Sequence, residues 1–358
     1  MKFQIDLKEI CFTLNNYCHK NCDDCYVNCS DELTNAKLSD IETYIRFLFK
    51  NNKSESREIN IDFMGGEMSK YPYLYELAEL INKVCLEFDY KVNDVRVTTY
   101  FGKSDDLILF CKTLNYKSLR FYIIRNLLES NIFNDIEYCK IVSRLRSSSV
   151  VLEHVFRSYQ IPHFKRLLVM CKTYEFIHVD ICYPCGDIGH DFTSNELDLI
   201  SKIYYDFIRV NEVDDDFTRR VYLGQVDHAI NYCELSINTL NTSKCNPFTE
   251  ELWLSPRGNI IPCAHLVKYD KLFDHNNINV INKDSTSFFT NRDNVKYTSQ
   301  SIDTDMCGHC IVKPWCVNCR ILPELMNVTS EQHVVNSIHK CNRTLTMVKV
   351  FMQNEDDL

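Results

Sequence analysis

The chain of 358 residues is poor in glycine and proline, with only eight of each. Disordered, repetitive and collagen-like chains are rich in these residues, so the composition excludes those classes. The chain also lacks an apolar run of about 18 residues that could cross a membrane as a helix. Its first ten residues alternate charged and apolar side chains, unlike a signal peptide. We therefore expect a cytoplasmic protein.

Long basic runs are absent as well, and the formal net charge is -9. Duplex nucleic acid is therefore an unfavourable main partner, although a local basic groove is compatible with an acidic total. Hydrophobic residues make up 45% of the chain, which is enough for a packed core. A chain of this length exceeds what one core usually fills, so we expect one large domain and a smaller one.

Cysteine, in contrast, is abundant, with 19 residues. The cytosol keeps thiols reduced, so a disulfide framework is excluded and metal or cluster ligation becomes the leading use. Cys18, Cys22 and Cys25 follow a C-x3-C-x2-C spacing on one short segment. Three thiolates without a fourth ligand indicate a 4Fe-4S cluster with one open iron. The alternative is a zinc knuckle completed by His19 or by Cys29.

A second motif, Gly65-Gly66-Glu67, directly follows a strand-like run at residues 59–64. Glycines let the backbone approach a ligand closely, and a carboxylate pairs with an ammonium group. In this order and combination, the cysteine motif and the Gly-Gly-Glu turn resemble the radical S-adenosylmethionine (radical SAM) superfamily. The resemblance implies a 4Fe-4S cluster on the three cysteines, SAM bound at its open iron, and a Gly-Gly-Glu turn that receives the SAM amino group.

Strand-like runs alternate with amphipathic segments such as residues 39–50 and 72–88. Alternating strands and helices indicate a parallel sheet with right-handed crossovers. The six predicted strands are residues 9–14, 59–64, 94–99, 119–124, 149–156 and 175–181. Six such units match the α/β partial (β/α)6 barrel of radical SAM enzymes, in which the cluster loop follows the first strand.

Other SAM contacts are predicted from position along the chain. Thr98 and Thr99 end the third strand, where each can contact SAM or simply terminate the strand. Relatives carry an aromatic residue just before the third cysteine of the cluster loop. Here Asp24 takes that position, and Tyr26, just after it, is the candidate cofactor contact. No catalytic acid or base is identified.

The carboxyl-terminal third contains a second cysteine system that is similar to the seven-cysteine SPASM extension. The resemblance implies two auxiliary 4Fe-4S clusters, and one or two zinc ribbons are the alternative. The distal cluster would use Cys307, Cys310, Cys316 and Cys341. The proximal cluster would use Cys245, Cys263 and Cys319, with Cys233 as the candidate fourth ligand and an open iron that binds substrate as the alternative. Residues 251–263 read as a β-hairpin with its turn at Pro256 to Gly258.

Four segments are expected along the chain. They are a radical SAM barrel at 1–215, a bridging segment at 216–244, a cysteine-rich SPASM-type domain at 245–345 and a polar tail at 346–358. The resemblance also implies partners, namely a peptide or protein substrate and an electron donor of the flavodoxin or ferredoxin type. Only seventeen residues precede Cys18, so we expect any leader peptide to dock on the barrel or on a separate protein.

Enzymes with this extension commonly modify peptides or proteins. We therefore expect a thioether or carbon-carbon crosslink, or a related oxidation, in the maturation of a ribosomal peptide. Formylglycine formation is an alternative. It is disfavoured because Ala264 and His265 follow Cys263, where sulfatase-maturing relatives carry an aspartate. The remaining alternatives are a radical SAM enzyme acting on nucleic acid and a non-catalytic protein that binds iron-sulfur clusters or zinc.

Overall fold

The computed structural model divides the chain into two compact units. The first contains Met1–Arg125, Ser130–Leu152 and Asn246–Lys296, and the second contains Asn126–Glu129, Glu153–Cys245 and Tyr297–Leu358. The structure describes residues 7–18, 25, 29, 33–100, 105–124, 127–128, 148–173, 178–182, 193–210, 221–222, 251–261, 267, 270–271, 273–274 and 277–281. The domain boundaries expected at residues 215 and 245 stay predictions.

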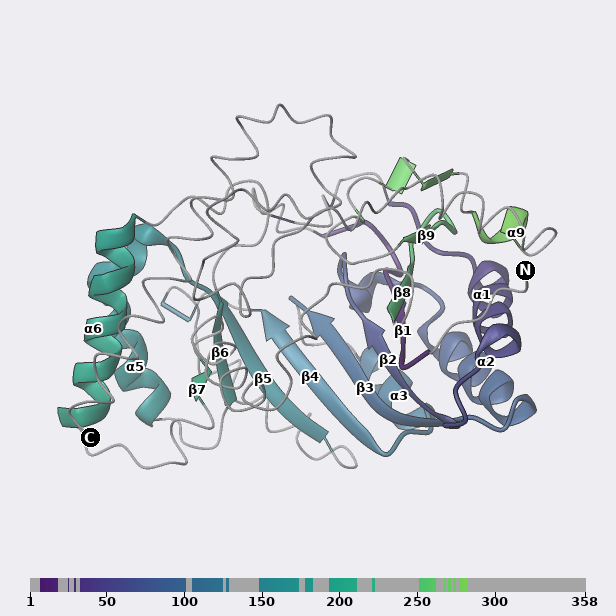
Figure 1. The fold of residues 1–358 in the computed structure, drawn as a ribbon, viewed down its shortest axis with the longest axis horizontal. Helices are drawn as coiled ribbons and strands as arrows, with labels where there is room; N and C mark the ends of the chain where they lie inside the picture. Colours follow the sequence, from purple (N-terminus) through teal and green to yellow (C-terminus); the bar gives the residue numbers. More distant parts are fainter. Residues whose placement is uncertain are drawn as a thin grey trace, which may run out of the picture. The chain divides into compact units, whose positions relative to one another are not determined.

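A mainly parallel sheet forms the centre of the first unit (Figure 1). Its strands are β1 (Glu9–Phe12), β2 (Glu58–Phe63), β3 (Lys91–Thr99), β4 (Ser118–Ile124), β8 (Glu251–Leu254) and β9 (Ile260–Ile261). Successive strands from β1 to β4 pair in parallel, as the strand-helix alternation predicts. The predicted α/β class with a parallel sheet is therefore confirmed.

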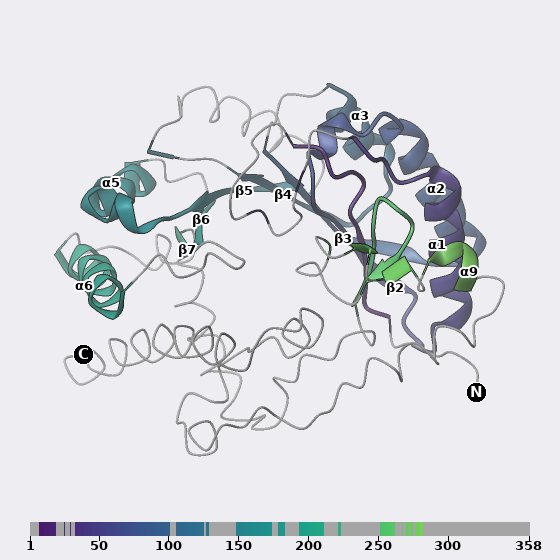
Figure 2. The ribbon, with the colours of Figure 1, turned by 90° about the horizontal axis from the view of Figure 1, so that it is seen from above.

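Helices cover one face of this sheet (Figure 2). They are α1 (Leu38–Asn51), α2 (Leu74–Glu87) and α3 (Asp105–Thr113), with a 3-10 turn at Met68–Lys70 and a short α9 (Ile278–Ile281). The first two helices confirm the predicted amphipathic segments. On α1 the buried stripe includes Ile41, Tyr44 and Leu48, which recur at helical spacing. No helix of the described part of the chain is long and apolar enough to cross a membrane.

The helix-covered face is apolar in successive rows across the strands. One row is Ile10, Ile61, Val95 and Leu119, and the next is Phe12, Phe63, Val97 and Phe121, each at most 1% exposed. Phe63 stacks on Phe12 with ring centroids 5.3 Å apart and meets Phe110 of α3 edge-on at 5.2 Å. Burial of these side chains from water supplies the main stabilisation of the unit, because hydrophobic gain scales with apolar area removed from solvent.

The predicted hairpin at residues 251–263 is confirmed by the antiparallel pair of β8 and β9. Its turn ends at Gly258, whose φ of +83° is costly for any residue with a side chain. The structure adds a pairing that the sequence does not predict, because β8 also lies parallel to β1. The hydroxyl of Tyr44 donates a hydrogen bond of 2.6 Å to the carbonyl of Leu252, which ties α1 to the same strand.

The second unit contains β6 (His178–Cys182) paired in parallel with β7 (Val221–Tyr222). Its helices are α5 (Phe164–Thr173) and α6 (Ser194–Val210), with a 3-10 helix at Ser158–His163. Thr193 and Glu196 exchange the hydrogen bonds of a capping box, which starts α6. β5 (Ser148–Val155) runs across the boundary between the units. All six predicted strands are thus present.

Candidate functional site

The Gly-Gly-Glu turn directly follows β2, at the carboxyl end of the parallel strands. Gly65 and Gly66 have φ angles of +88° and +59°, a region that L side chains rarely adopt. A Cβ atom on Gly66 would lie 2.1 Å from Oδ1 of Asn15 and 2.3 Å from its backbone oxygen. Both the conformation and the close approach of Asn15 therefore require glycine at this position.

Asn15 joins this turn to the start of the cysteine loop. Its Nδ2 donates a hydrogen bond of 3.0 Å to the carbonyl of Glu67, and its Oδ1 accepts one of 3.2 Å from the amide of Tyr17. The amide of Glu67 in turn donates 2.6 Å to the carbonyl of Tyr17. Asn15 is completely buried, and sequence reasoning missed it. The available signal was an asparagine placed between the first strand and the first cysteine.

The two ends of the segment that carries the cysteines are held together. Asn15 and Asn35 form an isolated antiparallel bridge, and the amide of Ala36 donates 2.8 Å to the carbonyl of Leu14. The amide of Thr34 also donates 2.7 Å to Oδ1 of Asn16. These bonds close the loop before any ligand binds, so the entropy of loop closure is already lost in folding.

Three thiols of the loop converge. The Sγ atoms of Cys25 and Cys29 are 3.8 Å apart, and Cys29 is buried. Hydrogen-bond contacts with Cys18 and then Cys25, followed by burial, raise the pKa of the Cys29 thiol. Soft thiolates suit an iron-sulfur cluster or zinc, so Cys18 and Cys25 fit the predicted cluster and, together with Cys29, fit the zinc alternative as well.

The complete cysteine trio is not tested by the structure. Cys22 and Tyr26 lie outside the described residues. Within the described ranges, no group of three or more histidine, cysteine or acidic side chains is arranged around a metal position. The assignment of Cys18, Cys22 and Cys25 as cluster ligands stays a prediction.

Glu67 is buried and its carboxylate is held by three protein donors. The hydroxyl of Thr99 donates 2.5 Å to Oε1, and the amides of Ser69 and Tyr100 donate 3.0 Å and 2.8 Å. A carboxylate accepts about four hydrogen bonds, so these contacts fix its orientation at the end of the strands. Thr99 therefore positions Glu67, whereas Thr98 lies on the opposite face of β3. Contacts of Gly65 to Glu67, Thr98 and Thr99 with SAM stay predictions.

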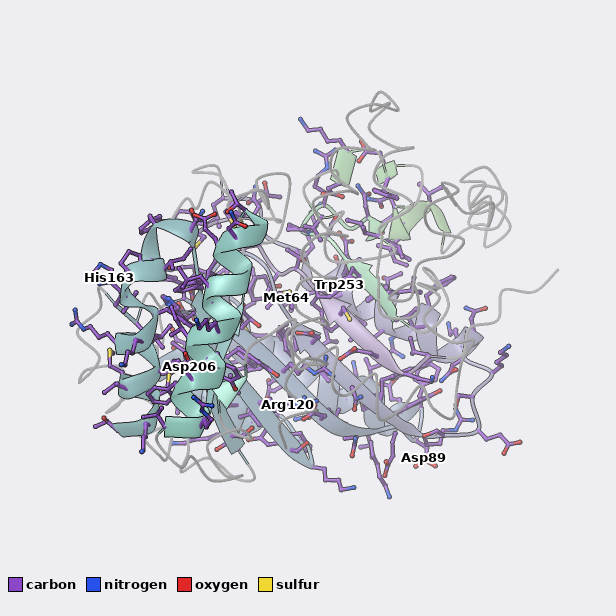
Figure 3. The ribbon with its side chains drawn as sticks, turned by 60° about the vertical axis from the view of Figure 1, so that its left-hand side comes forward. Met64, Asp89, Arg120, His163, Asp206 and Trp253 are labelled. Carbon is purple, nitrogen blue, oxygen red and sulfur yellow. The ribbon has the colours of Figure 1, made fainter. Side chains whose placement is uncertain are left out.

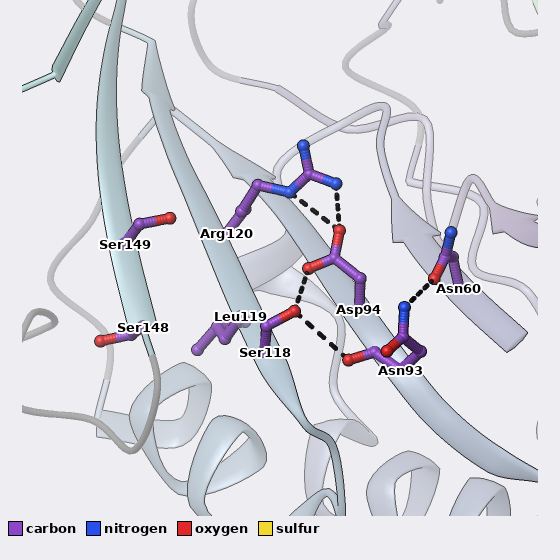
Figure 4. Close-up of a pocket in the computed structure, with 8 residues that line it drawn as sticks. All are labelled: Asn60, Asn93, Asp94, Ser118, Leu119, Arg120, Ser148 and Ser149. Atoms are coloured by element: carbon purple, nitrogen blue, oxygen red, sulfur yellow. Dashed lines mark hydrogen bonds and ion pairs between the residues drawn. The ribbon is translucent and has the colours of Figure 1, made fainter. Parts of the chain in front are cut away.

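The sheet face away from α1 to α3 is polar. In Figure 3, the labelled Met64 is the residue that follows β2, and Arg120 lies on β4. Arg120 forms an ion pair with Asp94, whose other oxygen accepts 2.7 Å from the hydroxyl of Ser118 (Figure 4). On the same face, Arg96 lies 3.2 Å from a carboxylate oxygen of Glu9. Sequence reasoning did not predict this charged face.

A cavity of about 470 Å³ opens on this face toward the amino ends of the strands (Figure 4). Its lining residues are Asn60, Asn93, Asp94, Ser118, Leu119, Arg120, Ser148 and Ser149. The Gly-Gly-Glu turn lies at the opposite, carboxyl ends of the same strands. The cavity is therefore separate from the candidate cofactor site.

The predicted auxiliary-cluster ligands all lie outside the described residues, so the structure does not test them. These are Cys233, Cys245, Cys263, Cys307, Cys310, Cys316, Cys319 and Cys341. The segments Asn246–Lys296 and Tyr297–Leu358, which contain most of them, belong to different compact units.

A parallel α/β sheet with a cysteine loop after its first strand, tied to a glycine turn after its second, places the chain in the α/β class. No protein-family model matches the chain, and no curated protein matches its sequence. Solved structures do match. The structure of anSMEcpe with bound AdoMet has a TM-score of 0.68 at 13% identity, over 96% of this chain and 98% of that chain.

Two further solved structures are similar. Streptococcus suis SuiB bound to S-adenosylmethionine has a TM-score of 0.57 at 15% identity, over 92% of this chain and 74% of that chain. anSMEcpe with bound AdoMet and the Cp18Cys peptide has a TM-score of 0.67 at 13% identity, over 98% and 99%. The chain therefore has the fold of the radical SAM enzymes, and the predicted resemblance is confirmed at that level.

Proposed function

We propose that this protein is a radical SAM enzyme that cleaves SAM reductively and abstracts a hydrogen atom from a peptide or protein. The observation that carries the proposal is the hydrogen bonding of Asn15 and Tyr17 to Glu67. It places the start of a three-cysteine loop against a Gly-Gly-Glu turn at the carboxyl ends of parallel strands. A fold shared with AdoMet-bound enzymes supports the same conclusion.

The chain's own residues would divide the work as follows. Cys18, Cys22 and Cys25 would hold a 4Fe-4S cluster, which with bound SAM supplies one-electron reduction and a 5'-deoxyadenosyl radical. Glu67 and the backbone at Gly65 and Gly66 would bind the amino group of SAM, because a buried carboxylate pairs with an ammonium group. Thr99, Ser69 and Tyr100 keep that carboxylate oriented before the cofactor arrives.

A peptide or protein substrate is the class that we favour, with a crosslink or related oxidation as the product. The SPASM-like cysteine spacing supports it, as does a similar structure with both AdoMet and a peptide bound. Formylglycine formation is a second candidate, because the fold is shared with anSMEcpe, an anaerobic sulfatase-maturating enzyme. Ala264 and His265 after Cys263 speak against it.

The decisive experiment is anaerobic reconstitution with iron and sulfide. With all three clusters in place we expect about twelve irons per chain. Dithionite and SAM should then release 5'-deoxyadenosine, whereas the Cys18→Ala, Cys22→Ala, Cys25→Ala triple variant should release none. SAM cleavage by the triple variant would refute the proposal. Four irons with bound zinc would refute only the auxiliary clusters.

A variant of Cys29 separates the cluster from the zinc knuckle. If Cys29 closes a four-ligand zinc site, Cys29→Ser should release metal, because a structural zinc site needs all four ligands. A three-cysteine cluster should keep its iron in this variant. The matched control is Cys85→Ser, which replaces another buried thiol outside the loop.

We also propose that a flavodoxin or ferredoxin supplies the electron and that any leader peptide docks on the barrel or on a separate protein. Replacing dithionite by reduced flavodoxin or ferredoxin tests the first partner. Failure of both proteins to support release of 5'-deoxyadenosine, while dithionite succeeds, would exclude them. For the substrate, mass spectrometry of candidate peptides distinguishes a crosslink, which loses two hydrogens, from an epimerisation, which changes no mass.

A further inference from the structure

Thr13 carries a buried hydroxyl that the protein does not satisfy. The residue is 1% exposed, and its Oγ1 has no hydrogen-bond partner among the described residues. An unsatisfied buried hydroxyl costs about 1–3 kcal/mol, and native structures contain few of them. Valine has the same shape, also favours strands and avoids this cost. The hydroxyl therefore has a use that the described protein contacts do not supply.

The position of Thr13 indicates what that use is. Thr13 follows β1, and its amide continues the ladder with a 2.9 Å bond to the carbonyl of Leu254. Phe12 points to the helix-covered face, where it packs against Tyr44, so Thr13 lies on the opposite face. That polar face of the sheet ends at the candidate cofactor site.

Thr13 has one neighbouring residue on each side across the sheet, and only one of the two leads to the candidate cofactor site. On one side, the register Phe12 to Leu254 places Ser255 next to it, and the Ser255 hydroxyl already accepts from the amides of Arg257 and Asn259 at 3.2 Å and 3.1 Å. On the other side, the register Phe12 to Phe63 places Met64 next to it. Met64 directly precedes the Gly-Gly-Glu turn.

Adjacent strands are about 4.8 Å apart, so Thr13 is one strand spacing from the chain that becomes the turn. We propose that Thr13 is a cofactor-binding residue whose hydroxyl hydrogen-bonds the amino-acid end of SAM. This inference rests on the proposed function. A hydroxyl both donates and accepts, so it matches the ammonium and the carboxylate at that end of the cofactor.

The test compares Thr13→Val and Thr13→Ser in the reconstituted enzyme, with SAM as the probe. SAM binding is measured by the change that SAM causes in the EPR spectrum of the reduced cluster. Thr13→Val should weaken SAM binding about tenfold to 150-fold, the range expected for one lost hydrogen bond to a charged group. Thr13→Ser keeps the hydroxyl and should bind SAM like the wild type. Thr43→Val is the control, since Thr43 is a half-buried threonine of α1 whose hydroxyl donates to the carbonyl of Ser39.

A stability measurement tests the premise independently. The thermal midpoint of the cluster-loaded Thr13→Val enzyme without SAM should equal or exceed that of the wild type, because the change removes an unsatisfied polar atom. A lower midpoint means that the hydroxyl is satisfied without SAM and overturns the inference. Unchanged SAM binding by Thr13→Val also overturns it, even if the cluster spectrum alone shifts. If the wild type itself neither binds nor cleaves SAM, the proposed function has failed, which is a distinguishable result.

Discussion

The two faces of the sheet formed by β1 to β4 differ row by row. The helix-covered face carries rows of aliphatic and aromatic side chains, such as the row with Phe12 and Phe63. The opposite face carries the ion pair of Asp94 with Arg120, together with Arg96 and Glu9. Burial of apolar side chains stabilises a fold by itself. A charge that is removed from water destabilises the fold unless it is paired with an opposite charge. The first face therefore stabilises the unit, whereas the second depends on the pairing of its charges.

The largest effect is expected on the helix-covered face. Phe63→Ala removes a ring that packs on Phe12 and Phe110, and it should lower the free energy of unfolding by about 3–5 kcal/mol. Urea denaturation measures the loss. Leu86→Ala is the control, since Leu86 is 83% exposed and its truncation should change little. Equal losses in the two variants would contradict the assignment of this face as the core.

The next effect is expected where the polar face meets the cofactor site. Gly66→Ala forces a Cβ atom against Asn15 and strains a residue with positive φ, so it should cost about 1–3 kcal/mol and abolish SAM binding. Urea denaturation followed by circular dichroism measures the loss of stability, and SAM titration measures the loss of binding. Gly258→Ala is the comparison, because its nearest atom would be 3.1 Å away in a side chain of Asp40. SAM binding retained by Gly66→Ala would show that the turn is not the binding element.

A smaller effect is expected within the polar face itself. Asp94→Asn removes the charge that pairs with Arg120 but keeps the shape and the contact with Ser118. Because Arg120 is 40% exposed and water can solvate it, we expect a loss of only about 1–2 kcal/mol by urea denaturation. Glu87→Gln at the exposed Arg46 pair should have no measurable effect. If Asp94→Asn lowered the free energy of unfolding as much as Phe63→Ala, the two faces would not differ in their contribution to stability.

The smallest effect concerns pH. Burial raises the pKa of Cys111 on α3 from 9.0 to about 12. The folded protein then keeps the thiol protonated, while the unfolded chain ionises it above pH 9. The stability from this group is therefore complete below pH 9 and falls as the pH rises toward 12, by about 1.4 kcal/mol at pH 10. Urea denaturation at several pH values between 8.5 and 10.5 should show that the free energy of unfolding falls less steeply with pH for Cys111→Ala than for the wild type. Parallel slopes would contradict the burial of this thiol.

Local patterns predicted much of the fold. The six strands, the helices α1 and α2 and the hairpin turn at Gly258 follow from periodicity and turn chemistry within short windows. The pairing of β8 with β1 could not be predicted in this way, since it joins segments some 240 residues apart, as Glu9 with Glu251 shows. Hairpin patterning states that two strands pair with each other, but not which edge of another sheet they join.

The residues of the candidate site also differ in how far the sequence predicts them. Gly65, Gly66 and Glu67 were recognisable because a glycine pair before a carboxylate has a chemical meaning in any context. Asn15 and Thr13 were not recognisable, because the type of a single asparagine or threonine does not predict its tertiary contacts. Cys29 was visible only as an alternative ligand until the structure placed its sulfur 3.8 Å from that of Cys25.

The sequence by itself determined the parallel α/β class, the positions of the strands and the chemistry available to the cysteine loop and the glycine turn. These properties depend on side-chain type and spacing along the chain, which are local. Only the tertiary structure decided that Asn15 joins the loop to the turn, that β8 extends the sheet beyond β1 and that one face of the sheet is charged. Those properties depend on which strands become neighbours, and that choice is settled by the packing of the whole unit.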